Sequence, residues 1–394
     1  MKYAKLADWV NINSGSTNLQ GLSRMADALQ ESLSTLPGTL ERIVLSPVPT
    51  MDGETHQSGD ALRLRFRPEA PVRVLFSGHM DTVFDAHHPF QSLKTDAAGI
   101  WHGPGVADMK GGLYIMIEAV RRFLEQDQLN TLGGEILINA DEELGSIGSQ
   151  DLLREAAEWN HLGLVFESCL PGGELVRGRK GTGTFKVIAH GKAAHTGRDF
   201  EKGRNAVAAL SSLLVECHAL NGKIPEAIIN VGNFMAPGPV NVVPDTAEAW
   251  LNIRIGRPES VQVIKDHLDR LIHQTEAAMA GIRIEITGDF LRAPKTETPA
   301  NAALHDLWNQ AEENLGFPPA GKRDTGGSSD GNVIGAAGLP HLDGIGIMGG
   351  DIHSDKEFAH PESIERQISK TVEFLNLVAR QPGTFCASPF GRES

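Results

Sequence analysis

In the first 180 residues, segments with helical spacing of apolar residues alternate with short, unbroken apolar runs. Helix is predicted across residues 1 to about 36, where apolar residues recur at three- and four-residue steps, at Leu22, Met25, Ala26, Leu29 and Leu33. Unbroken apolar runs predict strands near 42–46, 61–66, 71–78, 134–140 and 162–166, and helices are expected at 113–124 and 149–158. Strands alternating with helices favour an α/β sheet with helices on both faces.

A different order of elements follows residue 180. Strands are predicted at 184–190, 227–234, 246–255 and 282–286, and helices at 204–220 and 260–279. The resulting order, βαββαβ, is that of the ferredoxin-like, or split βαβ, unit. We therefore expect a small α+β domain at residues 180–292, inserted into a larger domain made of 1–179 and 293–394. Helices near 300–315 and 362–379 complete the larger domain.

Composition limits the function. The chain has 394 residues, of which 40% are hydrophobic, enough to fill two cores. Its formal net charge of −14 disfavours nucleic acid as a partner, because phosphate binding requires a basic surface. No run of 18 apolar residues predicts a membrane span, and Asp8 interrupts the region where a signal peptide would be apolar, so we expect a cytoplasmic protein. Three widely spaced cysteines predict neither a disulfide framework nor a paired-cysteine metal site.

Carboxylates gather where the predicted strands end. The strand near 134–140 runs into Asp141, Glu142 and Glu143, while His79 and Glu167 follow two other strands. In open α/β sheets, ligands bind at the carboxyl ends of the strands. Three adjacent anions at the rim of a core repel one another unless positive charge lies beside them. The pattern therefore raises the question of which cation these acids bind.

A metal ion is one answer. Zinc binds imidazole nitrogen and carboxylate oxygen, and a catalytic site leaves one position open for water. His79 can supply such a nitrogen, and Asp81, on the same side of an extended chain, can hold its other ring nitrogen. Glu142 and Glu143 point in different directions if extended, so one can bind metal while the other acts on water as a general base. Alone, the pair would be an ordinary solvated couple of acids.

Six motifs in order strengthen this hypothesis: 77–83 (SGHMDTV), 103–112 (GPGVADMKGG), 141–149 (DEELGSIGS), 191–197 (GKAAHTG), 241–245 (NVVPD) and 353–357 (HSDKE). From about residue 70 to its end, the chain resembles the co-catalytic zinc hydrolases that include glutamate carboxypeptidase, aminoacylase and succinyl-diaminopimelate desuccinylase. It is most similar to the bacterial glutamate carboxypeptidase branch. The resemblance implies a mixed-sheet zinc-peptidase catalytic domain with an inserted ferredoxin-like lid that also dimerises.

The resemblance also implies a metal site. One zinc would be held by His79, Asp108 and Glu167, and the other by His353, Asp108 and Glu143, so that Asp108 bridges two Zn²⁺ per subunit. Glu142 would be the general base, Asp81 would orient His79, and a cis peptide bond would follow Asp108. Because the same ligands accept Co²⁺ or Mn²⁺, the metal itself stays open.

The lid would contribute to substrate binding. His195 resembles a histidine that reaches into the partner subunit's cleft of a homodimer, and Arg254 resembles an arginine that binds the substrate's terminal carboxylate. Asn241 and the Gly-rich loop with Gly327 and Ser328 would assist. The alternatives are that Arg254 is a surface residue and that His195 is a local structural one.

These implications lead to one functional expectation and two alternatives. We expect a hydrolase that cleaves an amide or peptide bond beside a free carboxylate, in a small peptide or an N-acyl amino acid. Glu167 favours this class, since branches acting on free amino termini tend to have aspartate there. The alternatives are an N-acyl amino acid deacylase or desuccinylase and a non-catalytic metal-binding homologue. Residues 168–175 contain no basic group to recognise a substrate side chain, and Arg177 and Arg179 lie just beyond them.

Overall fold

A mixed six-stranded sheet forms the centre of the larger part of the protein. The computed structural model describes residues 2–50 and 54–386. The strand order is β1 (Thr39–Ile43), β4 (Ala61–Phe66), β8 (Leu132–Asn139), β5 (Val72–His79), β9 (Leu162–Val165) and β16 (His341–Asp343). The strands β8, β5, β9 and β16 pair in parallel, whereas β1 and β4 pair antiparallel. The carboxyl ends of β8, β5 and β9 therefore lie side by side.

Helices cover both faces of this sheet, as the sequence predicted. They are α1 (Ala4–Val10), α2 (Leu19–Leu33), α3 (Gly111–Gln126), α4 (Gln150–Trp159), α7 (Pro299–Asn314), α8 (Asp330–Ala336), α9 (Ser363–Arg380) and α10 (Pro382–Cys386). Ile136 and Ile138 of β8 belong to the core under α2, α3 and α9, while Leu137 between them packs with α4 and α8. This alternation is the period of two expected of a strand that is buried on both faces.

The prediction of one N-terminal helix is wrong, because a non-helical segment separates α1 from α2. Asn18 caps α2 by accepting a hydrogen bond from Gly21 N at 3.0 Å. The intervening segment runs beside the extension of β5: Ser16 N donates to Thr82 O at 3.0 Å and Thr82 N donates to Ser14 O at 3.0 Å. Asn, Ser and Gly in this segment favour local turns over helix, and the backbone instead pairs with the sheet.

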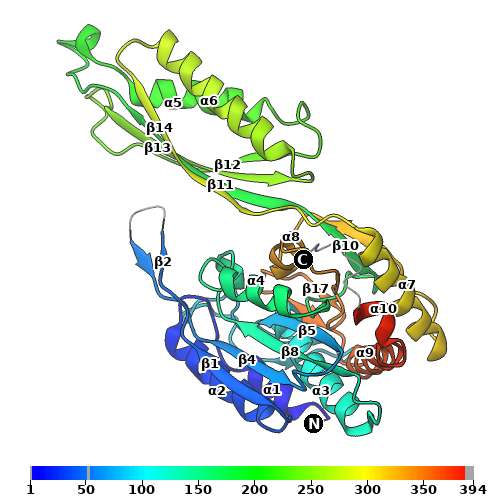
Figure 1. Ribbon diagram of the computed structural model, residues 1–394. Coiled ribbons are helices and arrows are strands. Elements are labelled where there is room, and N and C mark those ends of the chain that lie inside the picture. The colour runs from blue at the N-terminus through cyan, green and yellow to red at the C-terminus, as the bar shows by residue number, and fades with distance from the viewer. Residues whose placement is uncertain (1, 51–53, 387–394) are drawn as a thin grey trace.

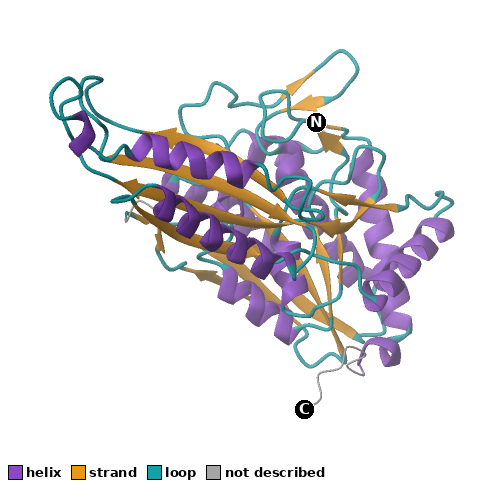
Figure 2. Ribbon diagram, turned by 90° about the horizontal axis from the view of Figure 1, so that it is seen from above, coloured by secondary structure: helices purple, strands orange, loops and turns teal. Residues whose placement is uncertain are grey.

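The inserted segment forms its own antiparallel sheet in the order β12 (Ile228–Met235), β13 (Thr246–Ile255), β11 (Gly181–His190) and β14 (Arg283–Arg292). Helices α5 (Ala206–His218) and α6 (Ser260–Ala278) cover one face of it and enclose a separate hydrophobic core. Figure 1 shows these helices on the side of the sheet that faces away from the central sheet, and Figure 2 shows them along its strands. We propose the division into 1–179 with 293–394, and 180–292, on this basis.

β14 extends six residues beyond the predicted end at 286, and neither α8 nor β16 was predicted. A small antiparallel sheet has the order β17 (Gly349–Gly350), β18 (Phe358–Ala359), β7 (Trp101–His102) and β6 (Lys94–Thr95). Two further strand pairs are β2 (Val48–Pro49) with β3 (Thr55–His56), and β10 (Leu175–Arg179) with β15 (Lys322–Thr325). Within the residues described, no helix is both long and apolar enough to cross a membrane.

Candidate metal and active site

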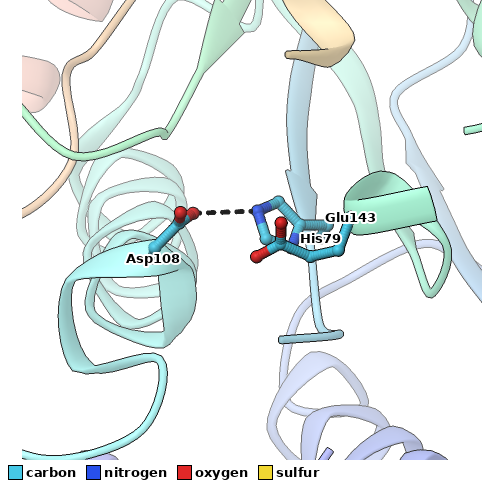
Figure 3. A group of neighbouring side chains, drawn as sticks. All are labelled: His79, Asp108 and Glu143. Atoms are coloured by element: carbon cyan, nitrogen blue, oxygen red, sulfur yellow. Dashed lines mark hydrogen bonds and ion pairs between the residues drawn. The ribbon is translucent and has the colours of Figure 1, made fainter. Parts of the chain in front are cut away.

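Three of the expected ligands converge at the carboxyl ends of the central strands. His79 ends β5, Asp108 lies in the short helical turn η1 (Val106–Lys110), and Glu143 lies in η2 (Glu142–Leu144), just after β8. One potential ligand atom from each lies within 4.8 Å of the others. His79 Nε2 is 3.1 Å from Asp108 Oδ1, and Figure 3 shows Glu143 beside this pair. His79 Nε2 is also 3.8 Å from Oε1 of Glu167, which follows β9.

His353 completes the second half of the cluster. Its Nε2 lies 3.2 Å from Asp108 Oδ2 and 3.1 Å from Glu143 Oε2. Asp108 thus presents one carboxylate oxygen to His79 and the other to His353. His353 has a φ of +62°, a conformation uncommon for residues other than glycine, and one that is often found at functional sites. The structure therefore brings all five predicted ligands together around Asp108.

The electrostatics of the cluster follow from burial and from its crowded acids. Burial and the neighbouring Asp108 raise the pKa of Glu143 to about 8 and also raise the pKa of Glu167 well above its usual value. Hydrogen bonds to Asp108 and Glu143 outweigh burial and raise the pKa of His353 to about 11. Burial alone would lower the pKa of His79, but its bonds to Asp108 and Asp81 raise it. Added positive charge would stabilise every carboxylate in this group.

Asp81 contacts both His79 and the turn that carries Glu142 and Glu143. His79 Nδ1 is 3.0 Å from the carbonyl oxygen of Asp81 and 3.3 Å from its Oδ1. The same carboxylate accepts hydrogen bonds from Glu142 N at 3.2 Å, from Glu143 N at 3.1 Å and from the Ser16 hydroxyl at 2.8 Å. Asp81 therefore links the orientation of His79 to the turn that carries both glutamates.

The donor set fits a pair of divalent metal ions. Imidazole nitrogen and carboxylate oxygen are the ligands that zinc takes at catalytic sites, and each metal position would have two terminal ligands plus Asp108. The histidine nitrogens of the two positions approach different oxygens of Asp108, which is the arrangement that a bridging carboxylate requires.

A cavity of about 620 Å³ opens beside these ligands. Its lining includes Glu142, Arg254, Gly327 and Ser328 together with Asp108, Glu143, Glu167 and His353. Arg254 lies on β13, opposite the face that α5 and α6 cover, and its Nη1 is 3.4 Å from Ser328 Oγ. Burial and the neighbouring Arg292 lower the pKa of Arg254. Metal ligands, a candidate base and a half-buried arginine thus share one cavity.

Comparison with known proteins identifies the family. Residues 75–380 match the profile described as "Peptidase family M20/M25/M40". The chain belongs to this family. As an M20 metallopeptidase or amidohydrolase it is an enzyme, and the expected relationship is confirmed.

Characterised relatives of this M20 enzyme include both peptidases and deacylases. Carboxypeptidase G2 from Pseudomonas sp. (strain RS-16) is 27% identical over 369 residues, which cover 91% of this chain and 85% of the relative. Succinyl-diaminopimelate desuccinylase from Methylorubrum populi is 27% identical over 365 residues, covering 86% and 89%. The two are equally similar in identity, so the comparison does not separate the two reactions.

Solved structures confirm the fold. A tripeptidase from Staphylococcus aureus superposes with a TM-score of 0.78 at 22% identity, covering 96% of this chain and 98% of the other. A dinuclear metal-binding peptidase of the M20 family from Bacillus subtilis has a TM-score of 0.68 at 14% identity, covering 96% and 97%. These likenesses show that the M20 enzyme has the expected mixed α/β fold.

Two predicted lid residues lie elsewhere in the M20 enzyme. His195 and Asn241 are exposed and close together, since His195 forms a bridge with Val242 and Thr196 N donates to Asn241 O at 3.2 Å. Neither is among the described residues that line the cavity. Within one chain, these two residues are therefore not brought to the metal ligands.

Sequence reasoning missed two residues that support the site. Glu357 was noted within a motif but given no role; it is 1% exposed and accepts hydrogen bonds from the N–H groups of Gly105, Ala107 and Asp108 at 2.9, 2.8 and 3.0 Å. Arg292, at the end of β14, forms an ion pair with Glu142, with 2.8 Å between Nη1 and Oε1. The HSDKE motif could have indicated Glu357, whereas no motif surrounds Arg292. The cis bond between Asp108 and Met109, implied by the resemblance, is present.

Arg179 lies just beyond residues 168–175, a segment without a basic residue. Its Nε and Nη2 donate to Asp343 Oδ2 and Oδ1 at 2.7 and 2.8 Å, a bidentate pair that fixes the guanidinium. Arg179 also lines the cavity, within reach of the charges of Glu167 and Glu142. The lining of the cavity therefore also carries positive charge from Arg179, Arg254 and Arg292.

Proposed function

We propose that this M20 enzyme is a two-metal hydrolase that cleaves an amide or peptide bond next to a free carboxylate, as a glutamate carboxypeptidase does. The observation that carries the proposal is one cavity lined by Glu142, Arg254 and four of the five candidate metal ligands, while the fifth, His79, lies 3.1 Å from Asp108. The candidate ligands would bind metal, Glu142 can move a proton, and Arg254 can bind an anion.

His79, Asp108 and Glu167 would hold one metal ion, and His353, Asp108 and Glu143 the other; zinc is the metal we propose. When bound, two such ions polarise a substrate carbonyl and make water a stronger acid. Glu142 would then take a proton from the attacking water and return it to the leaving amine. Its Oε1 contacts Arg292, while Oε2 has no protein hydrogen bond among the described residues and is free for this transfer.

Arg254 would bind the substrate carboxylate. Its guanidinium offers several N–H donors in one plane, which suits a carboxylate, and it is only loosely held by Ser328 at 3.4 Å and by Asn252 at 3.1 Å. Gly327 and Ser328 line the same cavity. A substrate whose carboxylate binds Arg254 would have its neighbouring amide in the cavity that Glu142 and the candidate ligands also line.

The second candidate reaction is removal of an N-acyl group, as in the desuccinylase relative. It uses the same base and metals, and the arginines that line the cavity would accept a carboxylate carried by either the acyl group or the amino acid. A non-catalytic metal-binding protein is disfavoured, because Glu142 lies beside a complete ligand set without being needed as a ligand.

We also propose that the enzyme acts as a homodimer through residues 180–292. β12 is an edge strand of the lid sheet, and it exposes apolar side chains that a second copy would cover, at Ile228, Phe234 and Met235. His195 and Asn241, which do not line the cavity of their own chain, are exposed on the same lid. A partner could supply them to the cavity, as the family resemblance implies.

The test is Glu142→Ala in zinc-reconstituted enzyme, assayed on a panel of N-acyl amino acids and dipeptides. We expect hydrolysis to be abolished while two metal ions per subunit are retained, because Glu142 is not a ligand. Glu158→Ala, an exposed glutamate on α4, is the matched control and should keep full activity. Full activity of Glu142→Ala would refute the mechanism, and the panel shows which of the two reactions is preferred.

A further inference from the structure

Arg292 connects the lid to the turn that carries Glu142. It is the last residue of β14 in the lid sheet, yet its side chain is only 4% exposed and reaches the catalytic side of the cavity. Nη2 donates to the carbonyl oxygen of Glu142 at 2.9 Å and to Ser146 Oγ at 2.5 Å. Nη1 lies 2.8 Å from Glu142 Oε1. One guanidinium therefore contacts both the backbone and the side chain of the same glutamate.

The turn held by Arg292 needs such support. Gly145 and Ser146 both have positive φ angles, +98° and +55°, so the chain reverses sharply after η2. Ser146 Oγ donates to Asp330 Oδ1 at 2.5 Å, and Asp330 Oδ2 accepts a bond from Asn139 at 2.7 Å. Arg292 thus joins a buried polar network that ties η2 to α8 and to the end of β8. Among the members of this network that the structure describes, Arg292 is the one from the lid.

We propose that Arg292 is a positioning residue that sets the orientation of Glu142 and couples it to the position of the lid. This inference rests on the proposed function, in which Glu142 is the general base. The ion pair fixes Oε1, so the direction of Oε2 toward the cavity is defined. A shift of β14 would move the guanidinium, and with it the base.

A direct role in binding substrate is disfavoured by the surroundings of Arg292. Its two terminal nitrogens already contact Glu142, Ser146 and, at 3.4 Å, Ser328. Arg254 is half-buried, and among the described residues it donates to Asn252 Oδ1 at 3.1 Å and to Ser328 Oγ at 3.4 Å. It is therefore the arginine available to a substrate carboxylate. The two arginines therefore divide the work between positioning and binding.

This division predicts different kinetic effects. A misplaced base slows the chemical step without weakening the binding of substrate. Arg292→Gln should lower kcat by about 100-fold and leave KM within about twofold. Arg292→Lys keeps the charge but loses the planar fork of donors, and should recover part of kcat. Ser146→Ala removes only one contact of the guanidinium and should lower kcat by a smaller factor, again with KM unchanged.

The experiment compares kcat, KM and bound metal for these three variants in zinc-loaded enzyme. Arg257→Ala is the control, because Arg257 is an exposed lid arginine that pairs with Glu226. A selective fall in kcat, at unchanged metal content and with partial recovery by lysine, supports the proposal. A rise in KM alone, an unchanged kcat, or loss of metal together with kcat would overturn it.

Two safeguards keep the result interpretable. If Arg292→Gln does not fold, Arg292→Lys and Ser146→Ala still decide, since unchanged kcat in both contradicts the proposal. Failure of the proposed function is seen separately, in wild-type enzyme that does not hydrolyse the panel or in active Glu142→Ala. An active wild type with inactive Glu142→Ala and fully active Arg292→Gln would refute only the role of Arg292.

Discussion

Replacing Glu357 by glutamine tests how far the loop that carries Asp108 depends on one buried carboxylate. Oε1 of Glu357 accepts bonds from Ala107 N and Asp108 N, and Oε2 accepts a bond from Gly105 N. Glutamine has nearly the same shape, but one of its two terminal atoms is a donor. If its oxygen stays at the double contact, its amide nitrogen faces the N–H of Gly105.

The magnitude follows from these three bonds. A buried N–H group left without an acceptor costs about 1–3 kcal/mol, and the two remaining bonds lose the strength that the negative charge gives them. The loop geometry, and hence the position of Asp108, is therefore disfavoured by roughly 2–3 kcal/mol. Residues that support metal ligands typically change metal affinity by about 10- to 100-fold, which is of the same size.

The assay is competition for zinc between the protein and a chromophoric chelator near neutral pH. We expect Glu357→Gln to bind zinc about 10- to 100-fold more weakly than wild type. Glu362→Gln is the control, since Glu362 lies in the same segment but its side chain is 74% exposed. An affinity within twofold of wild type in folded Glu357→Gln would show that the loop holds Asp108 without this carboxylate, and the reasoning would be wrong.

Three further outcomes follow. Arg254→Ala should raise KM by about 10- to 100-fold for substrates with a free carboxylate, and should change KM little for the same substrates with that carboxylate blocked as an ester. Equal losses on both kinds of substrate would contradict a role of Arg254 in binding the carboxylate. If His195 acts across a dimer, mixing inactive Glu142→Ala and His195→Ala subunits should restore activity, and no recovery would leave His195 with a local role. Burial and Lys295 lower the pKa of His341 from 6.5 to about 3, so the unfolded chain binds a proton below pH 6.5 that the folded chain does not, and stability is lost as pH falls. Between about pH 7.5 and 5.5, the wild type should therefore lose about 1.4 kcal/mol of unfolding free energy that His341→Gln does not lose. The difference in stability between the two proteins, measured by urea unfolding, should shrink by that amount. His273→Gln, which replaces a side chain that is 82% exposed, should show no such change relative to wild type.

Three of the candidate metal ligands could be predicted to lie together because they follow neighbouring parallel strands. His79, Glu143 and Glu167 follow β5, β8 and β9, whose carboxyl ends meet at one edge of the sheet. The apolar run before each of these residues predicted a strand, and the first polar residues after the run indicated where that strand ends. Asp108 lies in η1 and His353 in a turn, and both were assigned only through the resemblance of their motifs. The structure supports the assignment by bringing them into contact with the others.

The contacts of the supporting residues could not be predicted, because their partners are remote in sequence. Arg292 is 150 residues from Glu142, and Glu357 is 249 residues from Asp108. No local periodicity encodes such pairs: the HSDKE motif contains Glu357 without indicating its partners, and no motif surrounds Arg292. The interruption between α1 and α2 was missed for a related reason: the backbone of Ser14 and Ser16 forms hydrogen bonds with Thr82, which is remote in sequence.

The charges on the cavity walls bear on which substrates the enzyme accepts. The cavity lining combines the carboxylates of Asp108, Glu142, Glu143 and Glu167 with the guanidinium groups of Arg179, Arg254 and Arg292. Bound metal would largely neutralise the carboxylates, while Asp343 pairs with Arg179 and Glu142 pairs with Arg292. Arg254 forms no ion pair among the described residues, so a substrate ammonium group beside it would meet like charge in a partly desolvated site, whereas a carboxylate would meet opposite charge. This difference in charge supports the proposal that acylated amino acids and peptide carboxyl termini are preferred over molecules with a free amino terminus beside the scissile bond.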